Sequence, residues 1–187
     1  MNRQETERIS IAWASILLGL KLIKDSGRRK KMRWLLDCYE KKFIFNPASV
    51  HHHHSGIGGL CVHTSQVLEI ALQLFHDFRA HMPNVTAENV YVAVVLHDLP
   101  KTECYKIRVD VALGNPAYPF EYASEWKYEH DIWALSEANR FDLLLSYDEM
   151  MGIVQAHGGW SKLNDPVNKL AVIIHCADMI SSQLVKK

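Results

Sequence analysis

The adjacent pair His97 and Asp98 is the feature of this sequence most able to do chemistry, because both side chains are metal ligands. His63 lies before the pair and Asp178 lies near the C-terminus, which gives the order H…HD…D. Neutral imidazoles and carboxylates bind borderline divalent metals, and an ion held in this way can turn water into a nucleophile near neutral pH. The order therefore predicts a metallohydrolase.

Two further histidines, His130 and His157, lie between Asp98 and Asp178 and extend the order to H…HD…H…H…D. The extended set has enough donors for two adjacent ions. Adjacent residues of a helix point about 100° apart, so His97 and Asp98 could serve different ions, or Asp98 could bridge both. Donors of these types accept Fe, Mn, Co, Ni or Zn. We expect a divalent transition metal cofactor, with two ions rather than one.

Each candidate ligand also has an ordinary explanation. A single histidine is more often a surface residue or a hydrogen-bonded core residue, and Asp98 could simply pair with Lys101. Asp178 could make a buried hydrogen bond, although a carboxylate in an apolar segment is costly unless it is paired or bound to a metal. The joint order, and not any single residue, therefore indicates the metal site.

The elements that must position these residues are predicted to be almost all helices. The residues between 102 and 129 lack clear periodicity and could hold a short hairpin, and Gly27 is expected to end the first helix. Thr86 is a plausible N-cap of a buried helix that ends before Pro100. The pattern predicts a compact all-α domain with helices at 4–24, 28–43, 60–81, 87–96, 130–139, 147–157 and 166–185.

Composition favours one folded domain of 187 residues with no global attraction to polyanions, because 21 basic residues balance 21 acidic residues. The four cysteines are scattered without a C-x-x-C pair, as is typical of a reduced, cytoplasmic chain. The apolar segment 9–20 is too short to cross a membrane and has no features of a signal peptide. Its apolar face is expected to pack in the core or to form a homo-oligomer.

Three segments together carry a resemblance to a known family. They are PASVHHHHSGIGGLCVHT at 47–64, LHDLPKTECY at 96–105 and CADM at 176–179. The combination resembles the HD superfamily of metal-dependent phosphohydrolases. It is most similar to the HD domains of 3′–5′ exoribonucleases and of HD-type relaxases. The residues that match the family pattern of the first segment are His53, His54, Gly58, Gly59, Leu60, His63 and Thr64.

This resemblance implies a helical bundle with a metal site at its centre, in which N-terminal helices at 1–45 precede an HD core at 46–187. Pro100 departs from the family pattern, which usually has glycine before the lysine. The exonuclease relatives also carry a single-strand-binding domain that this sequence lacks, which disfavours a polymeric substrate. The resemblance implies His63, His97, Asp98 and Asp178 as primary ligands, and His130 and His157 as the extra ligands of two-metal members.

Residues near the ligands are candidates for contact with substrate. Lys101 could bind a nonbridging phosphate oxygen. His53 or His54 could donate a proton or bind phosphate, whereas the alternative is that the run of histidines at 51–54 is a solvated loop. Basic residues at 28–33 could attract phosphates, but such a run is more often a solvated helix face. Aromatic residues that could stack on bases, or simply pack, are Tyr105, Tyr118, Phe120, Tyr122, Trp126 and Tyr128.

These observations favour a phosphohydrolase that acts on a nucleotide or a nucleic-acid end through a metal-activated water. Asp98, Lys101 and His54 are its expected catalytic residues. The small size and neutral charge favour a nucleotide, and a nuclease acting on single-stranded nucleic acid is an alternative. A mixed-valent diiron oxygenase of the same superfamily is a second alternative. A ligand-sensing module without enzymatic activity ranks last, because all six candidate ligands are present.

Overall fold

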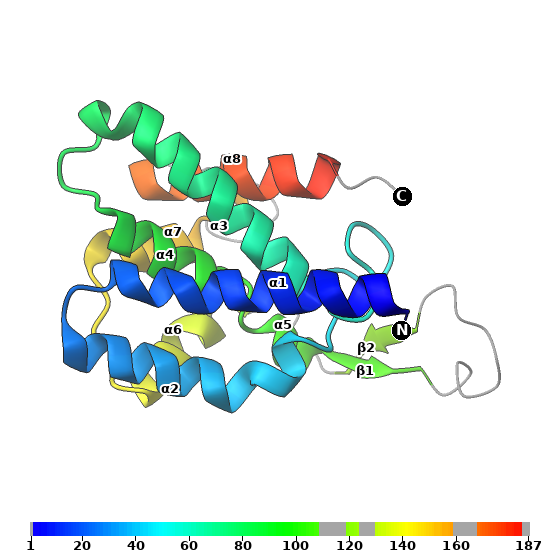
Figure 1. Ribbon diagram of the computed structural model, residues 1–187. Helices are drawn as coiled ribbons and strands as arrows, with labels where there is room; N and C mark the ends of the chain where they lie inside the picture. The colour runs from blue at the N-terminus through cyan, green and yellow to red at the C-terminus, as the bar shows by residue number, and fades with distance from the viewer. Residues whose placement is uncertain (1, 109–118, 124–129, 159–167, 185–187) are drawn as a thin grey trace.

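The computed structural model describes residues 2–108, 119–123, 130–158 and 168–184, without the side chains of His130 and Leu184. The described chain folds into a compact, almost wholly helical structure, as the periodicity predicts (Figure 1). Two short 3-10 helices, Leu20–Leu22 and Arg79–His81, extend α1 and α3. The helices are α1 (Arg3–Gly19), α2 (Ser26–Phe43), α3 (Gly59–Phe78), α4 (Ala87–His97), α5 (Lys101–Cys104), α6 (His130–Arg140), α7 (Tyr147–Val154) and α8 (Lys169–Leu184).

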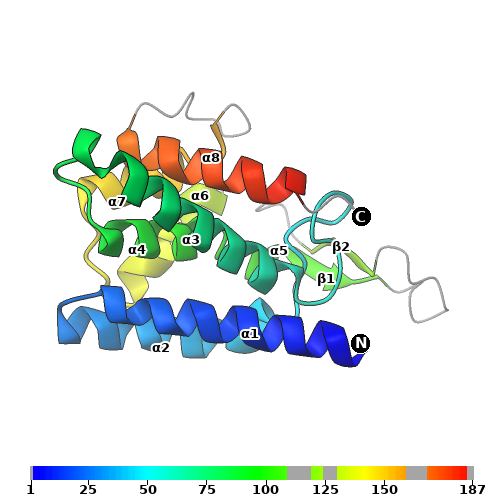
Figure 2. The ribbon, with the colours of Figure 1, turned by 45° about the horizontal axis from the view of Figure 1, so that its top comes forward.

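Helix α4 lies in the middle of the fold, between α3, α7 and α8 (Figure 2). Every residue from Val90 to His97 is buried. A helix that is apolar on all sides has to be covered on all sides, which explains its central place. Thr86 begins the helix, because its side chain accepts a hydrogen bond from the backbone of Asn89. A cap of this kind contributes about 0.5–2 kcal/mol. The last residue of this buried helix, His97, is consequently held inside the core.

Helices α1 and α2 run side by side along one side of the molecule, and α8 lies on the opposite side of α3 and α4 (Figure 1, Figure 2). Ile9, Trp13 and Ile16 form the buried face of α1, and α1 packs against α3. The apolar face that we expected either in the core or in a homo-oligomer is therefore covered by the chain's own helices.

Two predicted helix limits are wrong. Gly27 does not end the first helix but lies inside α2, because the side chain of Asp25 caps α2 by accepting a hydrogen bond from the Arg28 backbone. The helix predicted at 147–157 stops at Val154. His157 therefore lies beyond the end of α7, in an irregular segment that precedes Gly158, whose φ is 53°. Glycine is the residue that adopts this left-handed conformation without strain.

A short hairpin forms within 102–129, as the sequence predicts. Strand β1 (Tyr105–Ile107) pairs antiparallel with β2 (Phe120–Tyr122). Phe120 is buried, with its ring centroid 5.6 Å from that of Phe45. The rings of Tyr105 and Tyr122 lie 5.4 Å apart. These contacts favour the packing interpretation for the aromatic residues that are described. Three other aromatic candidates, Tyr118, Trp126 and Tyr128, lie outside the described residues.

Three of the basic residues at 28–33, namely Arg28, Lys31 and Arg33, take part in ion pairs within the chain. Arg28 contacts Glu88 at 2.6 Å and Glu149 at 2.7 Å, and Glu149 is fully buried. Lys31 pairs with Asp142. These contacts support the helix-face interpretation over attraction of phosphates.

All four cysteines are free thiols, two exposed and two buried. None of the helices in the described part of the chain has the length and apolar composition needed to cross a lipid bilayer.

Candidate metal centre

His63, Asp98 and Asp178 converge from three different helices or helix ends. The Nε2 atom of His63, on α3, lies 2.9 Å from Oδ1 of Asp178, on α8. The same nitrogen lies 3.4 Å from Oδ2 of Asp98, which is the C-cap residue of α4. All three residues are buried. The packing of α3 against α8 and α4 therefore produces the convergence that the H…HD…D order predicts.

His97 completes this group from the last turn of α4. Its Nε2 atom lies 3.7 Å from Oδ2 of Asp98. His63, His97 and Asp98 each offer a ligand atom, and these atoms lie within 4.8 Å of one another. Imidazole nitrogen and carboxylate oxygen bind Zn²⁺ at about 2.0–2.2 Å, so ligand atoms of one ion must be this close together.

Hydrogen bonds behind His63 decide which of its nitrogens faces the group. Nδ1 of His63 lies 3.0 Å from the hydroxyl of Ser181. That hydroxyl donates its single proton to Oε1 of Gln66 at 3.1 Å, so it accepts a hydrogen bond from His63. Nδ1 consequently carries a proton, and Nε2 is the nitrogen available to a metal. This is the arrangement by which protein metal sites commonly orient a histidine ligand.

His97 is oriented in the same way by the backbone. Its Nδ1 donates to the carbonyl oxygen of Val94 at 2.6 Å, which directs Nε2 toward Asp98. Among the described residues, the Nε2 atoms of His63 and His97 are both buried and make no hydrogen bond of regular geometry, although Nε2 of His63 faces the Asp178 carboxylate at 2.9 Å. Buried polar atoms without a partner are rare in native proteins, and a bound ion is one explanation for them. The two nitrogens and the adjacent carboxylates therefore fit a divalent transition metal.

The two histidines differ in their protonation when no ion is bound. Burial alone would lower the pKa of His63, but the carboxylates of Asp178 and Asp98 raise it above its ordinary value. Burial lowers the pKa of His97 despite the nearby charge of Asp98. The pKa of Asp178 lies well below its usual range, because the charge of His63 outweighs the effect of burial. An incoming ion therefore meets a neutral His97 and a charged His63.

Lys101 contacts both carboxylate oxygens of Asp98, at 2.7 and 2.8 Å. Burial alone would raise the pKa of Asp98, but Lys101 and the neighbouring histidines hold it well below its usual range. The pKa of Lys101 is raised in return, because Asp98 outweighs the effect of burial. The structure thus contains the ion pair between Asp98 and Lys101 that the sequence suggests as an ordinary explanation. The same Asp98 also belongs to the cluster of potential metal ligands.

His157 reaches the group from the segment after α7. Its Nε2 lies 3.3 Å from Oδ1 of Asp98, and its Nδ1 lies 3.2 Å from Oδ1 of Asp131. Burial alone would lower the pKa of His157, but Asp131 and Asp98 raise it to about 10. The backbone of His130 begins α6, whereas its side chain lies outside the described part of the chain. The prediction that His130 is a ligand stays a prediction.

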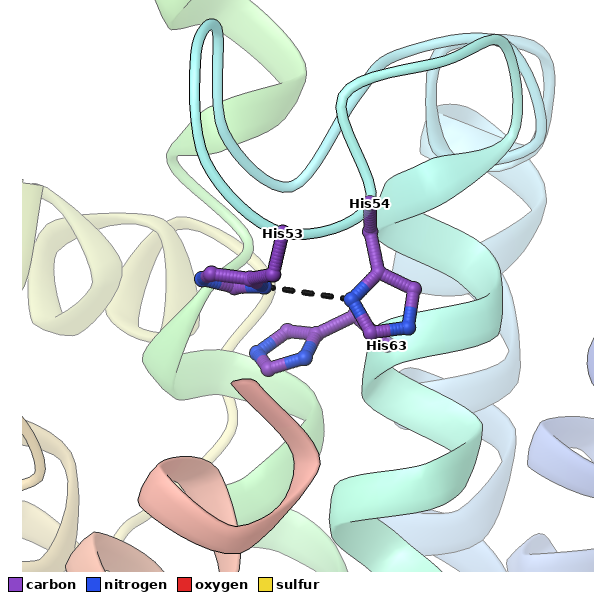
Figure 3. A group of neighbouring side chains, drawn as sticks. All are labelled: His53, His54 and His63. Carbon is purple, nitrogen blue, oxygen red and sulfur yellow. Dashed lines mark hydrogen bonds between the residues drawn. The ribbon is translucent and has the colours of Figure 1, made fainter. Parts of the chain in front are cut away.

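His53 and His54 lie against the outer side of His63 (Figure 3). Their ring centroids are 4.7 and 5.1 Å from the ring centroid of His63, and the two Nδ1 atoms are 3.1 Å apart. Burial, followed by the charge of His63, lowers the pKa of His53 to about 4 and of His54 to about 3. The two rings belong to the cluster, while the adjacent His51 and His52 are exposed.

Three residues that support the cluster are missing from the sequence-based predictions: Gln66, Asp131 and Ser181. Gln66 lies three residues after His63, and Ser181 lies three residues after Asp178. Positions three apart share a helix face, so polar residues at this spacing from a candidate ligand were the signal that could have found them. Asp131 had no such signal, because its partner His157 lies on a different element.

The chain is similar to curated proteins named 3′-5′ exoribonuclease YhaM. It is 29% identical over 161 residues to the protein from Geobacillus sp. strain WCH70, which covers 81% of this chain and 46% of that protein. For the proteins of Listeria welshimeri and Shouchella clausii, the identities are 24% over 170 residues and 23% over 159 residues. These matches cover 87% and 81% of this chain, and 50% and 46% of those proteins.

The chain spans about half the length of the curated relatives it matches. No family model and no solved structure matches it. The similarity extends over most of this chain. The chain is thus similar, at modest identity, to a part of proteins that are named as 3′-5′ exoribonucleases.

Proposed function

We propose that this chain is a metal-dependent phosphohydrolase domain of the HD superfamily, spanning residues 1–187, which cleaves a phosphate ester at a nucleic-acid end. The observation that carries the proposal is the pair of buried Nε2 atoms of His63 and His97, which make no hydrogen bond of regular geometry and lie beside two carboxylates. In this proposal His63, His97, Asp98 and Asp178 hold the ion. His130 and His157 are the additional ligands of a second ion.

A divalent ion bound there supplies a nucleophilic water near neutral pH and neutralises charge on the phosphate. The protein residues fix the donor geometry. Ser181 and the carbonyl of Val94 hold the two imidazoles in the tautomer that presents Nε2. Because these partners lie on α8 and α4, the same helix packing that builds the core also orients the ligands.

Lys101 is proposed to contact a nonbridging phosphate oxygen. Its ammonium group lies on both oxygens of Asp98, at the edge of the candidate ligand set. With Asp98 engaged as a metal ligand, its carboxylate would attract Lys101 less strongly, and the ammonium group could then pair with a phosphate. A lysine acts in such a contact as a compact charge with rotatable donors.

His53 and His54 are proposed to bind the phosphate, with their Nε2–H groups turning from Ser182 and Gln66 to the phosphate when substrate is present. Their lowered pKa values, about 4 and about 3, mean that both rings are neutral at neutral pH. A neutral imidazole is a hydrogen-bond donor but a poor reservoir of protons. The lowered pKa values therefore favour the phosphate-binding role over the proton-donor role that the sequence also suggests for His54.

The substrate we favour is a 3′ end of RNA, because the curated relatives are named 3′-5′ exoribonucleases. This choice reverses the preference for a free nucleotide that small size and neutral charge suggest. The match covers about half of those relatives, so the test must include small substrates as well.

The test uses protein reconstituted with Mn²⁺ and a panel of substrates: single-stranded RNA and DNA labelled at the 5′ end, nucleoside mono- and triphosphates, and cyclic dinucleotides. We expect stepwise shortening of RNA from the 3′ end, which Asp98→Ala abolishes. Hydrolysis of free nucleotides alone would redirect the proposal to a small substrate. Oxygen uptake by iron-loaded protein, without hydrolysis of any phosphate ester, would contradict the proposal and support the diiron oxygenase.

A further inference from the structure

Two groups of potential ligands in this structure share His63. We call the first the inner position; it contains His97 and Asp98, with all members fully buried. We call the second the outer position; it contains His53 and His54, which are half-buried. The single Nε2 atom of His63 can bind only one ion at a time, so an ion in one position lies next to the empty ligands of the other.

The loop that carries the outer histidines is held tightly against the start of α3. The carbonyl oxygen of His54 accepts a hydrogen bond from the backbone of Ala48 at 3.1 Å. A Cβ atom at Gly59 would lie 1.8 Å from that same oxygen. His54 itself has a φ of 49°, a left-handed conformation that costs a non-glycine residue free energy and often marks a functional site. Gly59 and His63 are four residues apart and share one face of α3, so the loop lies over His63.

Hydrogen bonds on the far side of each outer ring direct both Nδ1 atoms toward each other (Figure 3). Nε2 of His54 donates to the amide oxygen of Gln66 at 3.0 Å. The hydroxyl of Ser182 donates to the carbonyl of Asp178 at 2.8 Å, so it accepts from Nε2 of His53 at 3.3 Å. In these tautomers both Nδ1 atoms carry lone pairs at a separation of 3.1 Å, and a proton or a metal ion between them is required.

A metal ion satisfies this requirement with the geometry on hand. Two nitrogens 3.1 Å apart can both lie about 2.0–2.1 Å from one ion. His63 supplies a third nitrogen, since the ligand atoms that the three histidines offer lie within 4.8 Å of one another. Gln66 and Ser182 act as the acceptors behind the outer rings, as is usual for histidine ligands. Three imidazoles suit Co²⁺, Ni²⁺, Cu²⁺ or Zn²⁺.

From this we infer that His53, His54 and His63 form a loading position, which captures a divalent transition metal ion at the more exposed side and passes it to the inner position. His63 is the ligand common to both positions and serves as the pivot of the transfer. The inference rests on the proposed function only for the destination of the ion. Once the ion has moved inward, His53 and His54 are again available to a substrate.

The first test removes one inner ligand and asks where an ion binds. His97→Gln leaves the ion pair between Asp98 and Lys101 intact, so the variant is expected to fold. We expect it to bind Co²⁺ at the outer position, with a visible absorption spectrum different from that of the wild type. Adding His53→Gln and His54→Gln should then weaken Co²⁺ binding by more than the roughly 10–100-fold that loss of an outer-shell partner causes.

The second test measures the rate at which the wild-type chain takes up Co²⁺, followed by absorbance after rapid mixing. The variant His53→Gln/His54→Gln should take up Co²⁺ about tenfold more slowly, which is the lower end of the 10–100-fold effect of removing a residue that supports a metal ligand. It should reach the same final Co²⁺ content as the wild type. The matched control is His51→Gln/His52→Gln, which changes the exposed neighbours in the same loop and should load at the wild-type rate.

Equal loading rates for the wild type and His53→Gln/His54→Gln would overturn the inference, and so would Co²⁺ binding by His97→Gln that does not depend on His53 and His54. A failure of the proposed function has a different signature. In that case His97→Gln would leave the Co²⁺ spectrum and affinity of the wild type unchanged. If Co²⁺ binding were then lost on replacement of His53 and His54, the result would still support the outer position.

Discussion

Nε2 of His63 and Oδ1 of Asp178 lie 2.9 Å apart, although the two residues come from the third and the last long helices. The contact is buried, and on the other side of the imidazole Ser181 from the same last helix accepts a hydrogen bond from Nδ1. Helix α8 therefore contributes both a potential metal ligand and the residue that orients its partner. The packing of α8 on α3 therefore brings His63 and Asp178 together.

Replacement of Asp98 by alanine is expected to abolish turnover and to remove the ion from the inner position, which leaves only the outer position of His53, His54 and His63 able to bind metal. It also leaves the partly buried Lys101 without its carboxylate partner, which should cost about 1–3 kcal/mol in the free energy of unfolding. The Co²⁺ absorption spectrum and urea denaturation measure the two effects. The double variant Asp98→Ala/Lys101→Met should recover much of the stability but not the wild-type Co²⁺ spectrum. A wild-type Co²⁺ spectrum or wild-type turnover in either variant would refute the assignment of Asp98.

Replacement of Ser181 by alanine is expected to weaken metal binding without removing a ligand. The hydroxyl holds His63 in the tautomer that presents Nε2, and loss of such a partner typically lowers metal affinity by about 10–100-fold. Competition with a chromogenic chelator measures the change. The matched control is Ser10→Ala, because the Ser10 hydroxyl bonds only within its own exposed turn of α1. An unchanged affinity in Ser181→Ala would mean that the tautomer is set in another way.

Metal binding is expected to release protons. His157 has a pKa of about 10 without metal, and the pKa of His63 is raised as well, so both rings are charged at pH 7.5. A ligating imidazole must be neutral, so each ring that binds an ion loses its proton. Affinity should therefore fall as the pH falls, by about tenfold per pH unit for each proton released.

Calorimetric titration with metal in two buffers of different ionisation enthalpy counts these protons. Heats that differ between the buffers are expected, with His157→Gln releasing fewer protons than the wild type. Identical heats in both buffers would show that the charged rings do not become ligands.

The sequence predicts the primary cluster well because the residue types are specific and the helices are strongly patterned. His63, His97, Asp98, His157 and Asp178 meet as their joint order suggests, because α3, α4 and α8 pack against one another through apolar faces. The limits of α2 and α7 are less well predicted. Capping by Asp25 and the early end of α7 depend on single local hydrogen bonds, which outweigh periodicity at a helix end.

The supporting residues are harder to predict from sequence. Gln66 and Ser181 read as ordinary polar residues on partly exposed helices, and only the meeting of α3 with α8 gives them a partner. Lys101 shows the opposite difficulty. Its contact with Asp98 is a local pair that the sequence already suggests, and the contact by itself does not distinguish a structural lysine from one that binds substrate.

Replacement of Gly59 by alanine is expected to displace the loop that carries His53 and His54. The added Cβ would lie 1.8 Å from the carbonyl oxygen of His54, so the backbone has to move. Strain of this kind typically costs about 1–3 kcal/mol. Gly56→Ala is the matched control in the same loop, because no atom lies within 4 Å of its added Cβ.

Thermal unfolding and the rate of Co²⁺ uptake measure the effects of both glycine variants. The expected result is a less stable and more slowly loading Gly59→Ala protein beside an unchanged Gly56→Ala protein. Equal behaviour of the two variants would show that the loop is not held against α3 as described.

The most direct test of the central claim is a crystal structure of the protein grown with Mn²⁺, with data collected to locate the ion by its anomalous scattering. The account predicts a peak at a bonding distance of about 2.0–2.3 Å from Nε2 of His63 and His97 and from the carboxylates of Asp98 and Asp178. A peak bound by none of these residues, or their side chains unchanged and free of metal at saturating Mn²⁺, would contradict it.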